Sequence, residues 1–426
     1  MKRIRPFVNK GILRDALLFL KSFLPGNLLR LGLGKAAGEE WKMVRKQRPW
    51  HPGLKDFDSG VNLVGYFRTV KGISEAARSS VLALNAVDIP YSVIDYEFGV
   101  PASQQVESLP TSNFGNGFIF NTNLFHVNPP QFPYLWNIFN ERDLTSRYNI
   151  GVWYWELPEI PEDWCFAFDL VDEVWVATQF IFDSVSAKSS VPVVKIPPCI
   201  HTVYDQNLHR SDFDLPDDCF LFMCAYDVLS VQKRKNPFGV IEAFKRTFNG
   251  TDSTVGLVIK VNNAVENLKE IKRLRNLLKK YSNCFIIDTV FDKVTFNSLI
   301  NLVDVYVSLH RSEGFGLIPA EAMSLGKPVI MTRWSGNLDL MTTDNSCGVD
   351  YKLTPVGNGA GHYTLEQIWA DPDVDHASFF MQKLYSDNKF YDQISYKAKI
   401  TIRNNFSPER IGELVKERMK QIGLLS

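Results

Sequence analysis

Residues 303–331 of this chain read VDVYVSLHRSEGFGLIPAEAMSLGKPVIM, and this stretch decides the fold. Its apolar beginning, from Val303 to Leu309, predicts a buried strand that runs into a glycine-bearing loop. The next residues predict a short helix that ends before Gly326, and Pro328 begins a second apolar strand. The stretch therefore predicts a β-α-β unit, in which two parallel strands are joined by a helix that covers one face of their sheet.

Two carboxylates lie on the loop and the helix of this unit. Glu313 belongs to the loop, and Glu321 follows eight residues later, in the first turn of the predicted helix. A helix N-terminus favours phosphate through its dipole and unpaired N–H groups, and Gly314 and Gly316 would let a ligand approach the backbone. An ionised glutamate also accepts hydrogen bonds from paired hydroxyls. Either acid could instead be a solvated or helix-stabilising charge, but the glycines and the position at the carboxyl end of a strand favour a nucleotide-sugar site.

Residues 313–330, EGFGLIPAEAMSLGKPVI, resemble the Glu-x7-Glu signature of the retaining family 4 glycosyltransferases, which have the two-domain GT-B fold. The resemblance implies that Glu313 contacts the hydroxyls of the donor sugar or the charge that develops on it. It also implies that Glu321 holds the ribose of the nucleotide. By the same resemblance, the sugar and the diphosphate would meet backbone amides around Phe315, Gly316 and Leu317.

Strands and helices alternate through most of the chain, in two series. A length of 426 residues exceeds a single hydrophobic core, and the Pro- and Asp-rich residues 197–218 are the best candidate for a linker. Such alternation predicts a doubly wound, mostly parallel sheet on each side of the linker. The predicted strands are 61–67, 91–96, 118–121, 150–155, 173–177 and 193–196 in the first series, and 220–225, 255–261, 284–288, 303–309 and 328–332 in the second.

The expected architecture is α/β and of the GT-B type, with two Rossmann-like domains that face a central cleft. The resemblance covers about residues 60–410. It implies an acceptor domain over 56–205 and a donor domain over 218–405, and a basic segment over 1–55 precedes them. A last helix, within 408–426, begins after the N-cap Ser407 and by the same resemblance returns to the first domain.

A basic turn after the first strand of the second series supplies candidate phosphate ligands. Residues 233–235 read KRK and precede a helix, where cations would face the phosphates and stabilise a diphosphate leaving group. The turn is similar to the Arg and Lys clamp of the family, although Tyr226-Asp227 stands where the family commonly has Gly-Arg. We therefore assign the clamp to Arg234 and Lys235, with a solvated basic turn as the alternative.

The first series contributes three further candidates. Gly72 opens a helix after the first strand, and the resemblance implies that it approaches the donor phosphate or the acceptor. His126 follows a strand and would by resemblance contact the donor sugar or the acceptor in catalysis, although a lone histidine is as readily structural. Glu156 lies in the aromatic run 150–161, IGVWYWELPEIP, which looks like a subgroup of the family that acts in bacterial surface polysaccharide synthesis. Glu156 would bind acceptor hydroxyls, whereas we expect the core to contain Trp153, Trp155 and Trp175.

Metal chemistry is not expected. The pairs Asp371/Asp373 and Asp212/Asp214 match an Asp-x-Asp form, but they lie in Pro- and Asp-rich loops and indicate turns. The six cysteines are scattered and mostly adjoin apolar residues, which favours reduced, buried thiols and a cytoplasmic protein. They are Cys165, Cys199, Cys219, Cys224, Cys284 and Cys347.

The net charge of zero hides an asymmetry between the N-terminus and the rest of the chain. Residues 1–50 contain 12 Lys and Arg against 3 Asp and Glu, a net charge of +9, which leaves −9 for the remainder. Their apolar, basic run 12–24 is too short and too charged to span a membrane, but it suits the surface of an anionic one. The alternatives are a helix packed on the body of the protein and a solvated tail.

Together these features predict a retaining hexosyltransferase. It would move a hexose, mannose or a similar sugar, from a nucleoside diphosphate sugar to a hydroxyl of a growing cell-surface glycan, such as a lipopolysaccharide, or of a lipid-linked oligosaccharide. We expect no metal, no other cofactor and no nucleic-acid partner. The alternatives are a nucleotide-sugar epimerase or hydrolase on the same fold and an inactive homologue that binds glycans.

Overall fold

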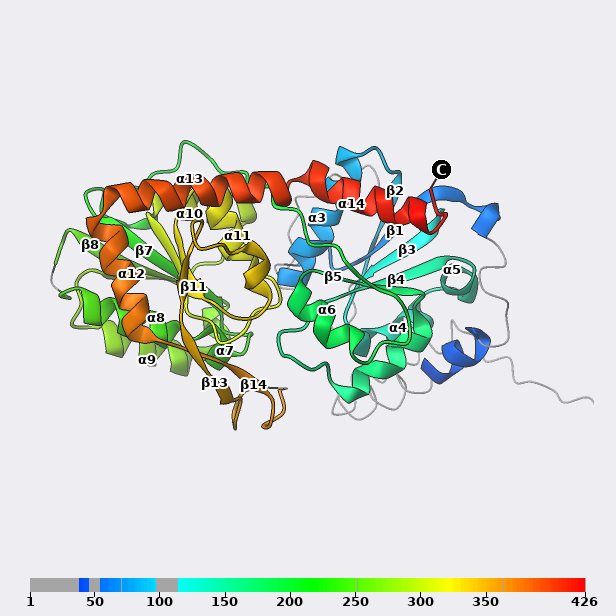
Figure 1. Cartoon of the computed structure of the whole chain (residues 1–426), viewed down its shortest axis with the longest axis horizontal. Helices are drawn as coiled ribbons and strands as arrows, with labels where there is room; N and C mark the ends of the chain where they lie inside the picture. Colours follow the sequence, from blue (N-terminus) through cyan, green and yellow to red (C-terminus); the bar gives the residue numbers. More distant parts are fainter. Residues whose placement is uncertain are drawn as a thin grey trace, which may run out of the picture.

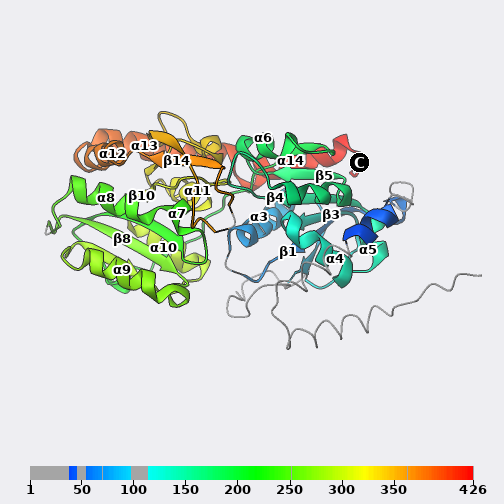
Figure 2. The same ribbon diagram turned by 90° about the horizontal axis from the view of Figure 1, so that it is seen from below.

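The computed structural model describes residues 38–45, 54–69, 71–96, 114–250, 252–361 and 363–425. Two six-stranded parallel sheets lie side by side, and helices cover the faces of each one (Figures 1 and 2). Both faces of each sheet are apolar, because each face is covered and packs into a core. In the second sheet, for example, Val258 belongs to one hydrophobic cluster, and its neighbours Leu257 and Ile259 belong to another. The predicted α/β architecture of two Rossmann-like domains is confirmed.

The first sheet has the strand order β2-β1-β3-β4-β5-β6. Its strands are β1 (Asp58–Gly65), β2 (Tyr91–Asp95), β3 (Phe120–His126), β4 (Tyr148–Trp153), β5 (Glu173–Val176) and β6 (Val193–Lys195). The helices of this domain are α3 (Gly72–Ala86), α4 (Phe132–Ile138), α5 (Glu141–Thr145) and α6 (Gln179–Ser186). The order of the strands reverses between β1 and β3, which is where a doubly wound sheet opens a crevice.

The second sheet has the order β12-β11-β10-β7-β8-β9 and reverses between β7 and β10. Its strands are β7 (Phe220–Asp227), β8 (Val255–Asn262), β9 (Cys284–Ile287), β10 (Val305–Ser308), β11 (Val329–Thr332) and β12 (Cys347–Val349). Its helices are α7 (Gln232–Lys235), α8 (Pro237–Thr247), α9 (Leu268–Leu278), α10 (Lys293–Leu302), α11 (Leu317–Ser324), α12 (Val374–Ser386) and α13 (Asn388–Asn405). An antiparallel hairpin of β13 (Tyr351–Pro355) and β14 (Ile368–Pro372) lies outside this sheet.

The last helix, α14 (Pro408–Gln421), returns to the first domain, as Figure 1 shows in red. It packs on α3, where Val415 and Met419 join the core of the first sheet. Gly412 allows the two helices to approach closely, because a Cβ atom there would lie 2.4 Å from the carbonyl oxygen of Ala83. The buried carboxylate of Glu173 also forms an ion pair with Arg418 of this helix.

The sequence prediction ended the third strand of the first series at residue 121 and placed His126 after it, which was wrong about residues 122–126. They belong to β3, at the centre of the first sheet. Polar residues are stable in this strand because they satisfy one another. The amide of Asn62 in β1 donates to Asn123 at 2.9 Å, and Asn123 donates to Asn149 in β4 at 2.9 Å. This amide ladder replaces the apolar contacts that usually identify a central strand.

Residues 38–45 form a helix that packs on the first domain. Trp41 is fully buried and stacks on Trp136, and Arg45 forms an ion pair with Asp172 at 2.6 Å. The membrane prediction was made for residues 1–50, and of these residues 1–37, which include the apolar, basic run 12–24, and 46–50 lie outside the described residues. Across the described ranges, no helix combines the length and the apolar character that crossing a membrane requires.

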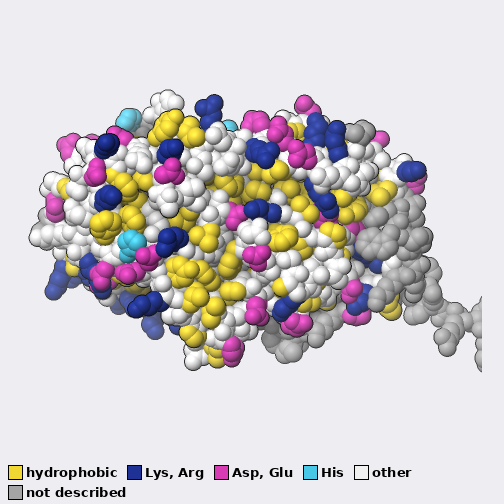
Figure 3. Space-filling view, in the orientation of Figure 1, with side chains coloured by type: hydrophobic (Ala, Val, Ile, Leu, Met, Phe, Trp, Pro, Cys, Tyr) yellow, Lys and Arg dark blue, Asp and Glu magenta, His cyan; other side chains and the backbone are white. Residues whose placement is uncertain are grey.

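Charged side chains of both signs are interspersed on the face of the molecule shown in Figure 3. Such a mixed surface favours solubility and carries no strong field of one sign across that face.

Gly412→Ala tests the close packing of α14 on α3. An alanine in an exposed helix stabilises it by roughly 1 kcal/mol relative to glycine. At Gly412 the added methyl group meets the backbone of Ala83, so we expect a net loss of about 1–3 kcal/mol in the free energy of unfolding. Urea denaturation measures this change, with Glu417→Ala on the exposed side of the same helix as the control. An increase in stability for Gly412→Ala would contradict the close contact.

Candidate active site

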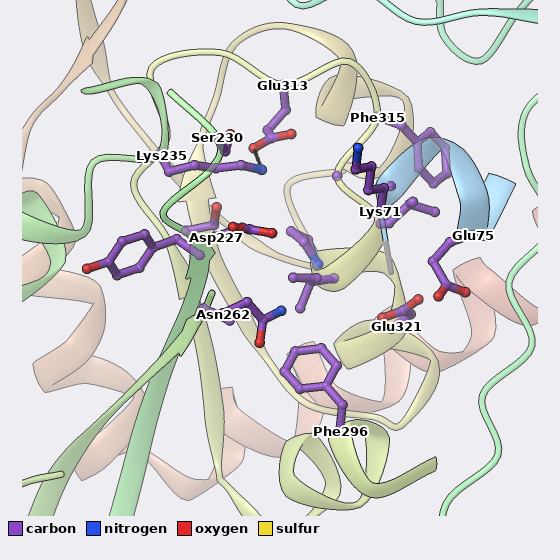
Figure 4. Close-up of a pocket in the computed structure, with 18 of the residues that line it drawn as sticks. Lys71, Glu75, Asp227, Ser230, Lys235, Asn262, Phe296, Glu313, Phe315 and Glu321 are labelled. Atoms are coloured by element: carbon purple, nitrogen blue, oxygen red, sulfur yellow. Dashed lines mark hydrogen bonds and ion pairs between the residues drawn. The ribbon is translucent and has the colours of Figure 1, made fainter. Parts of the chain in front are cut away.

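Both sheets direct the carboxyl ends of their strands at a cleft between the domains, with a volume of about 980 Å³. In the second sheet, the loops after β7 and β10 leave from the point where the strand order reverses. The first of these loops leads to Arg234 and Lys235, and the second carries Glu313, so the topology brings these residues together. Figure 4 shows Lys235 beside Glu313. Across the cleft, Lys71 and Gly72 begin helix α3 of the first domain.

Glu313 is the centre of an ion cluster. Its side chain is only 12 % exposed, its Oε1 atom lies 3.2 Å from Nη1 of Arg234, and the same atom pairs with the ammonium group of Lys235 (Figure 4). Burial by itself raises the pKa of Glu313, but the charges of Lys235 and Arg234 outweigh burial and lower this pKa from 4.5 to about 2. Glu313 is therefore an ionised carboxylate that two cations hold in place.

Arg234 is held from several sides. Its guanidinium group donates to the carbonyl oxygen of Ser312 at 2.9 Å and to Oγ of Ser230 at 3.2 Å. On the side of the first domain, Nη2 lies 3.6 Å from Oε1 of Glu156. Burial lowers the pKa of Arg234, but the carboxylates of Glu313 and Glu156 more than offset it, so the net shift is upward. Arg234 is thus a fixed positive charge at the boundary between the domains.

Glu321 is the second glutamate of the β10–α11 segment that lines the cleft. It lies in α11, is 5 % exposed, and one of its oxygens pairs with Lys293 at the start of α10. Burial raises the pKa of Glu321, the charge of Lys293 opposes this effect, and Glu75 of the first domain adds to it. Oε2 of Glu321 accepts no hydrogen bond from the described residues. This buried oxygen beside the cleft therefore keeps an acceptor position that a ligand hydroxyl would satisfy.

The glycines of the β10–α11 loop serve two different purposes. Gly316 has a φ of +94° and forms the N-cap of α11, a conformation that residues with a Cβ atom rarely adopt. Gly314 instead allows the domains to approach, because a Cβ atom there would lie 3.1 Å from the carbonyl oxygen of Trp155. The carbonyl oxygen of Gly314 also accepts a hydrogen bond from Thr178 at 3.0 Å. The sequence suggested that both glycines make room for a ligand, whereas Gly314 makes room for the first domain.

The predicted donor-binding residues of this loop line the cleft together with Gly72. A Cβ atom on Gly72 would lie 3.9 Å from Cδ1 of Leu317, so these residues face each other across the cleft. The ring of Phe315 packs edge-on against Phe406, with centroids 5.7 Å apart, and is therefore part of the core. The N–H groups of Phe315, Gly316 and Leu317 precede or begin α11, where a helix leaves its donors unpaired.

His126 does not lie in the cleft. It ends β3 and is 2 % exposed, and its ring borders a small separate cavity behind α3. Nε2 of His126 lies 3.0 Å from Oγ of Ser80. Burial lowers the pKa of His126 to about 3, so the imidazole is neutral near pH 7. The structure supplies no contact between His126 and the residues around Glu313.

Glu156 lines the cleft, but its carboxylate is directed at the second domain. Oε2 accepts a hydrogen bond from the hydroxyl group of Tyr363 at 3.0 Å, and Oε1 faces Arg234. The neighbouring tryptophans are core residues, as the sequence predicted: Trp153, Trp155 and Trp175 are each exposed by 2 % or less.

Sequence reasoning missed several residues that complete the site. Lys293 pairs with Glu321, and Lys71 faces the cleft from the first domain (Figure 4). Ser335 has a φ of +77°, and its Oγ atom accepts a hydrogen bond from the backbone N–H of Glu313 at 2.8 Å. Only Lys71 had a local signal, since it directly precedes Gly72 at a helix N-terminus. Lys293 and Ser335 are brought in by tertiary packing alone.

The Asp-x-Asp pairs have structural partners. Asp373 caps α12 by accepting hydrogen bonds from the N–H groups of Asp375 and His376, and Asp371 forms an ion pair with Arg311 at 2.7 Å. Asp212 takes part in a capping box with His209. Among the described residues, no three His, Cys, Asp or Glu side chains are grouped so that they could hold a metal ion.

Comparisons with known proteins agree with this geometry. Residues 226–400, less than half of the chain, match the family model described as "Glycosyl transferases group 1". Among solved structures, the chain resembles HepE of Anabaena in complex with UDP and glucose, with a TM-score of 0.58, 12 % identity, and coverage of 85 % of this chain and 100 % of that one. It also resembles sucrose-phosphate synthase of Thermosynechococcus elongatus, with a TM-score of 0.61, 13 % identity and coverage of 85 % and 99 %. A glycosyltransferase of Rickettsia africae gives a TM-score of 0.60, 15 % identity and coverage of 86 % and 99 %.

These likenesses establish that the chain has the GT-B fold and that its second domain matches the group 1 glycosyl transferase model. A search of curated protein sequences gave no match.

The lowered pKa of Glu313 predicts a specific dependence of stability on pH. The stabilisation from ionised Glu313 is fully present above 4.5, its ordinary pKa, and is lost as the pH falls towards about 2. Lys235→Met removes one of the two cations, so the pKa of Glu313 rises and less stabilisation remains to be lost in acid. Urea denaturation between about pH 6 and pH 3.5 measures the loss. The control is Lys389→Met on the exposed surface, and equal acid sensitivity in all three proteins would contradict the pairing.

Proposed function

We propose that this chain is a retaining glycosyltransferase that moves a hexose from a nucleoside diphosphate sugar to a hydroxyl of a cell-surface glycan or a lipid-linked oligosaccharide. The observation that carries the proposal is the Glu313 cluster at the point where the strand order of the second sheet reverses, inside a domain that matches the group 1 glycosyl transferase model. The HepE structures that resemble this chain contain UDP with glucose or UDP-glucose, which supports a UDP-sugar as the first donor to test.

The donor would lie along the second domain, from Glu321 to Glu313. The free oxygen of Glu321 would accept hydrogen bonds from the ribose hydroxyls, with Lys293 holding the carboxylate in place. The diphosphate would meet the N-terminus of α11 and the cations Arg234 and Lys235. A negatively charged leaving group gains most from such fixed charges when its bond to the sugar breaks.

The charge balance of the site favours Lys235 as the residue that responds to the donor. In the described site, the charges of Arg234 and Lys235 are balanced by Glu313 and Glu156. A diphosphate adds negative charge, so a cation has to turn from a carboxylate to a phosphate. Lys235 is suited to this, since its side chain is 26 % exposed and flexible, whereas Arg234 is 6 % exposed and held by backbone.

Retention of configuration is proposed to follow from a front-face displacement. The Glu313 carboxylate would be a poor nucleophile because both cations engage it. The departing phosphate oxygen would instead take the proton of the acceptor hydroxyl as the bond between the sugar and the acceptor oxygen forms on the same face. Glu313 would orient the sugar through its hydroxyl groups. Closure of the domains would exclude water, which competes with the acceptor.

Glu313→Gln and Lys235→Ala test the proposal. A screen of UDP-, GDP- and TDP-sugars for protection against thermal unfolding first identifies the donor. With that donor, both variants are expected to lower turnover at least about 100-fold, because each removes a charge from the site of bond cleavage. The release of nucleoside diphosphate, with and without candidate acceptors, measures turnover and separates transfer from hydrolysis.

Glu162→Gln and Lys389→Ala are the matched controls, since both side chains are exposed and lie outside the cleft. Wild-type turnover in Glu313→Gln would contradict the proposed role of Glu313 in sugar transfer.

We further propose that residues 1–37 hold the protein at an anionic membrane surface, where lipid-linked acceptors are found. The support is their excess of basic residues and their apolar run 12–24. Flotation with vesicles of phosphatidylcholine and phosphatidylglycerol is expected to carry the full chain but not a chain that begins at residue 38. The shortened chain keeps the helix at 38–45, which packs on the first domain. Equal flotation of both chains, or binding to neutral vesicles alone, would contradict this role.

A further inference from the structure

The hairpin of β13 and β14 belongs to the second domain but reaches the first. In Figure 1 it projects at the bottom of the second domain, beside the boundary between the two. The residues that join its strands bury Val356, Ala360 and Tyr363, which are 4 %, 2 % and 6 % exposed. These residues belong to the same hydrophobic cluster as Trp155 and Trp164 of the first domain. The hairpin connection is therefore part of a core that both domains share.

Three contacts define how the hairpin connection meets the first domain. The ring of Tyr363 packs edge-on against Trp155, with centroids 5.5 Å apart. The hydroxyl group of Tyr363 donates a hydrogen bond to Oε2 of Glu156 at 3.0 Å. Four residues further along the chain, Nε2 of Gln367 donates to the carbonyl oxygen of Glu159 at 2.8 Å. All three exist only while the domains are together.

Glu156 continues this connection into the ion cluster. While Oε2 accepts from Tyr363, Oε1 faces Nη2 of Arg234 at 3.6 Å, and Arg234 contacts Glu313 at 3.2 Å. The backbone of Glu156 is fixed as well, because its carbonyl oxygen accepts a hydrogen bond from Ser312 of the second domain. Both oxygens of the Glu156 side chain are thus directed at groups of the second domain.

We propose that Tyr363 and Glu156 are positioning residues that couple closure of the domains to the placement of Arg234. This inference rests on the proposed function, in which Arg234 faces the donor diphosphate. Tyr363 holds the Glu156 carboxylate in the orientation that places its second oxygen beside the guanidinium group. Arg234 then has a carboxylate on each side and stays directed at the cleft when Lys235 turns to the donor.

The geometry distinguishes this role from acceptor binding by Glu156. Oε1 and Oε2 of Glu156 face Arg234 and Tyr363, two contacts with the second domain that binding of acceptor hydroxyls by itself does not require. Tyr363 meets Glu156 at the Arg234 end of the site, whereas Lys293 pairs with Glu321 at the end proposed to hold the ribose. Tyr363 therefore acts on the diphosphate through Arg234 and not on the nucleoside.

Tyr363→Phe is the first test, because it removes the hydroxyl group and keeps the ring that packs on Trp155. Loss of a hydrogen bond to a charged group changes a rate by about tenfold, so we expect kcat to fall by about that factor. The Kd for uridine, or for the nucleoside of the donor found in the screen, is expected to change by less than about twofold, because a nucleoside lacks the diphosphate that Arg234 faces. Tyr391→Phe is the matched control, because its hydroxyl group also donates a 3.0 Å hydrogen bond, to the carbonyl oxygen of Asp304 and outside the cleft.

Glu156→Gln and the double variant test whether the two residues act as one unit. The amide oxygen of glutamine still accepts from Tyr363 but carries no charge for Arg234. If the two residues act in series, Tyr363→Phe/Glu156→Gln is expected to lower kcat no further than the worse single variant. Independent effects that multiply would contradict the coupling.

Hydrogen exchange of the backbone amides provides a readout that does not require sugar transfer. Tyr363→Phe is expected to speed exchange in residues 155–160 and 356–367, on both sides of the contact, relative to wild type and to Tyr391→Phe. Wild-type exchange and wild-type kcat in Tyr363→Phe would overturn the inference while leaving the proposed function intact. If the wild-type chain cleaves no nucleotide sugar, the proposed function is wrong. The role of Tyr363 in turnover is then wrong as well, even if Tyr363→Phe speeds hydrogen exchange.

Discussion

The site depends on one interaction, the sharing of a buried Glu313 oxygen between Arg234 and Lys235. A carboxylate with so little exposure is stable only if opposite charges replace the water it has lost. The two cations are available because β7 and β10 are neighbours in the sheet although about 80 residues separate them in the chain. The reversal of the strand order therefore supplies both the crevice and the charges within it.

Backbone packing around the cluster explains how Glu313 is held. The loop after β10 and the turn after β11 interlock so closely that a Cβ atom on Gly336 would lie 2.0 Å from the carbonyl oxygen of Gly314. In that turn, Ser335 adopts a left-handed φ of +77° and accepts the N–H of Glu313. Strain of this kind persists where the surrounding contacts over-determine a position, as they do here. The carbonyl oxygen of Gly314 is bonded in turn to Thr178, so the same loop also joins the domains.

The predictions from sequence succeeded where a local pattern carried them. Apolar runs bounded by glycine and proline identified the strands of the second sheet, and the spacing of Glu313 and Glu321 identified two carboxylates that line the cleft. They failed at β3, because the buried Asn123 satisfies its amide through Asn62 and Asn149 on neighbouring strands. A polar residue that is paired in this way looks like a loop residue when only the sequence is read.

By itself, the sequence determined the α/β class, the two domains and the residues of the β10–α11 loop, because alternation, turns and helix termini depend on neighbours in the chain. Only the tertiary structure decided which of these residues act together. It placed His126 beside a separate cavity, directed both oxygens of Glu156 at the second domain, and brought Lys293 to the cleft and Tyr363 to Glu156. The physical reason is that charge pairing and domain contact are long-range interactions. Their partners are chosen by the strand order and by the approach of the two domains, which no local pattern encodes.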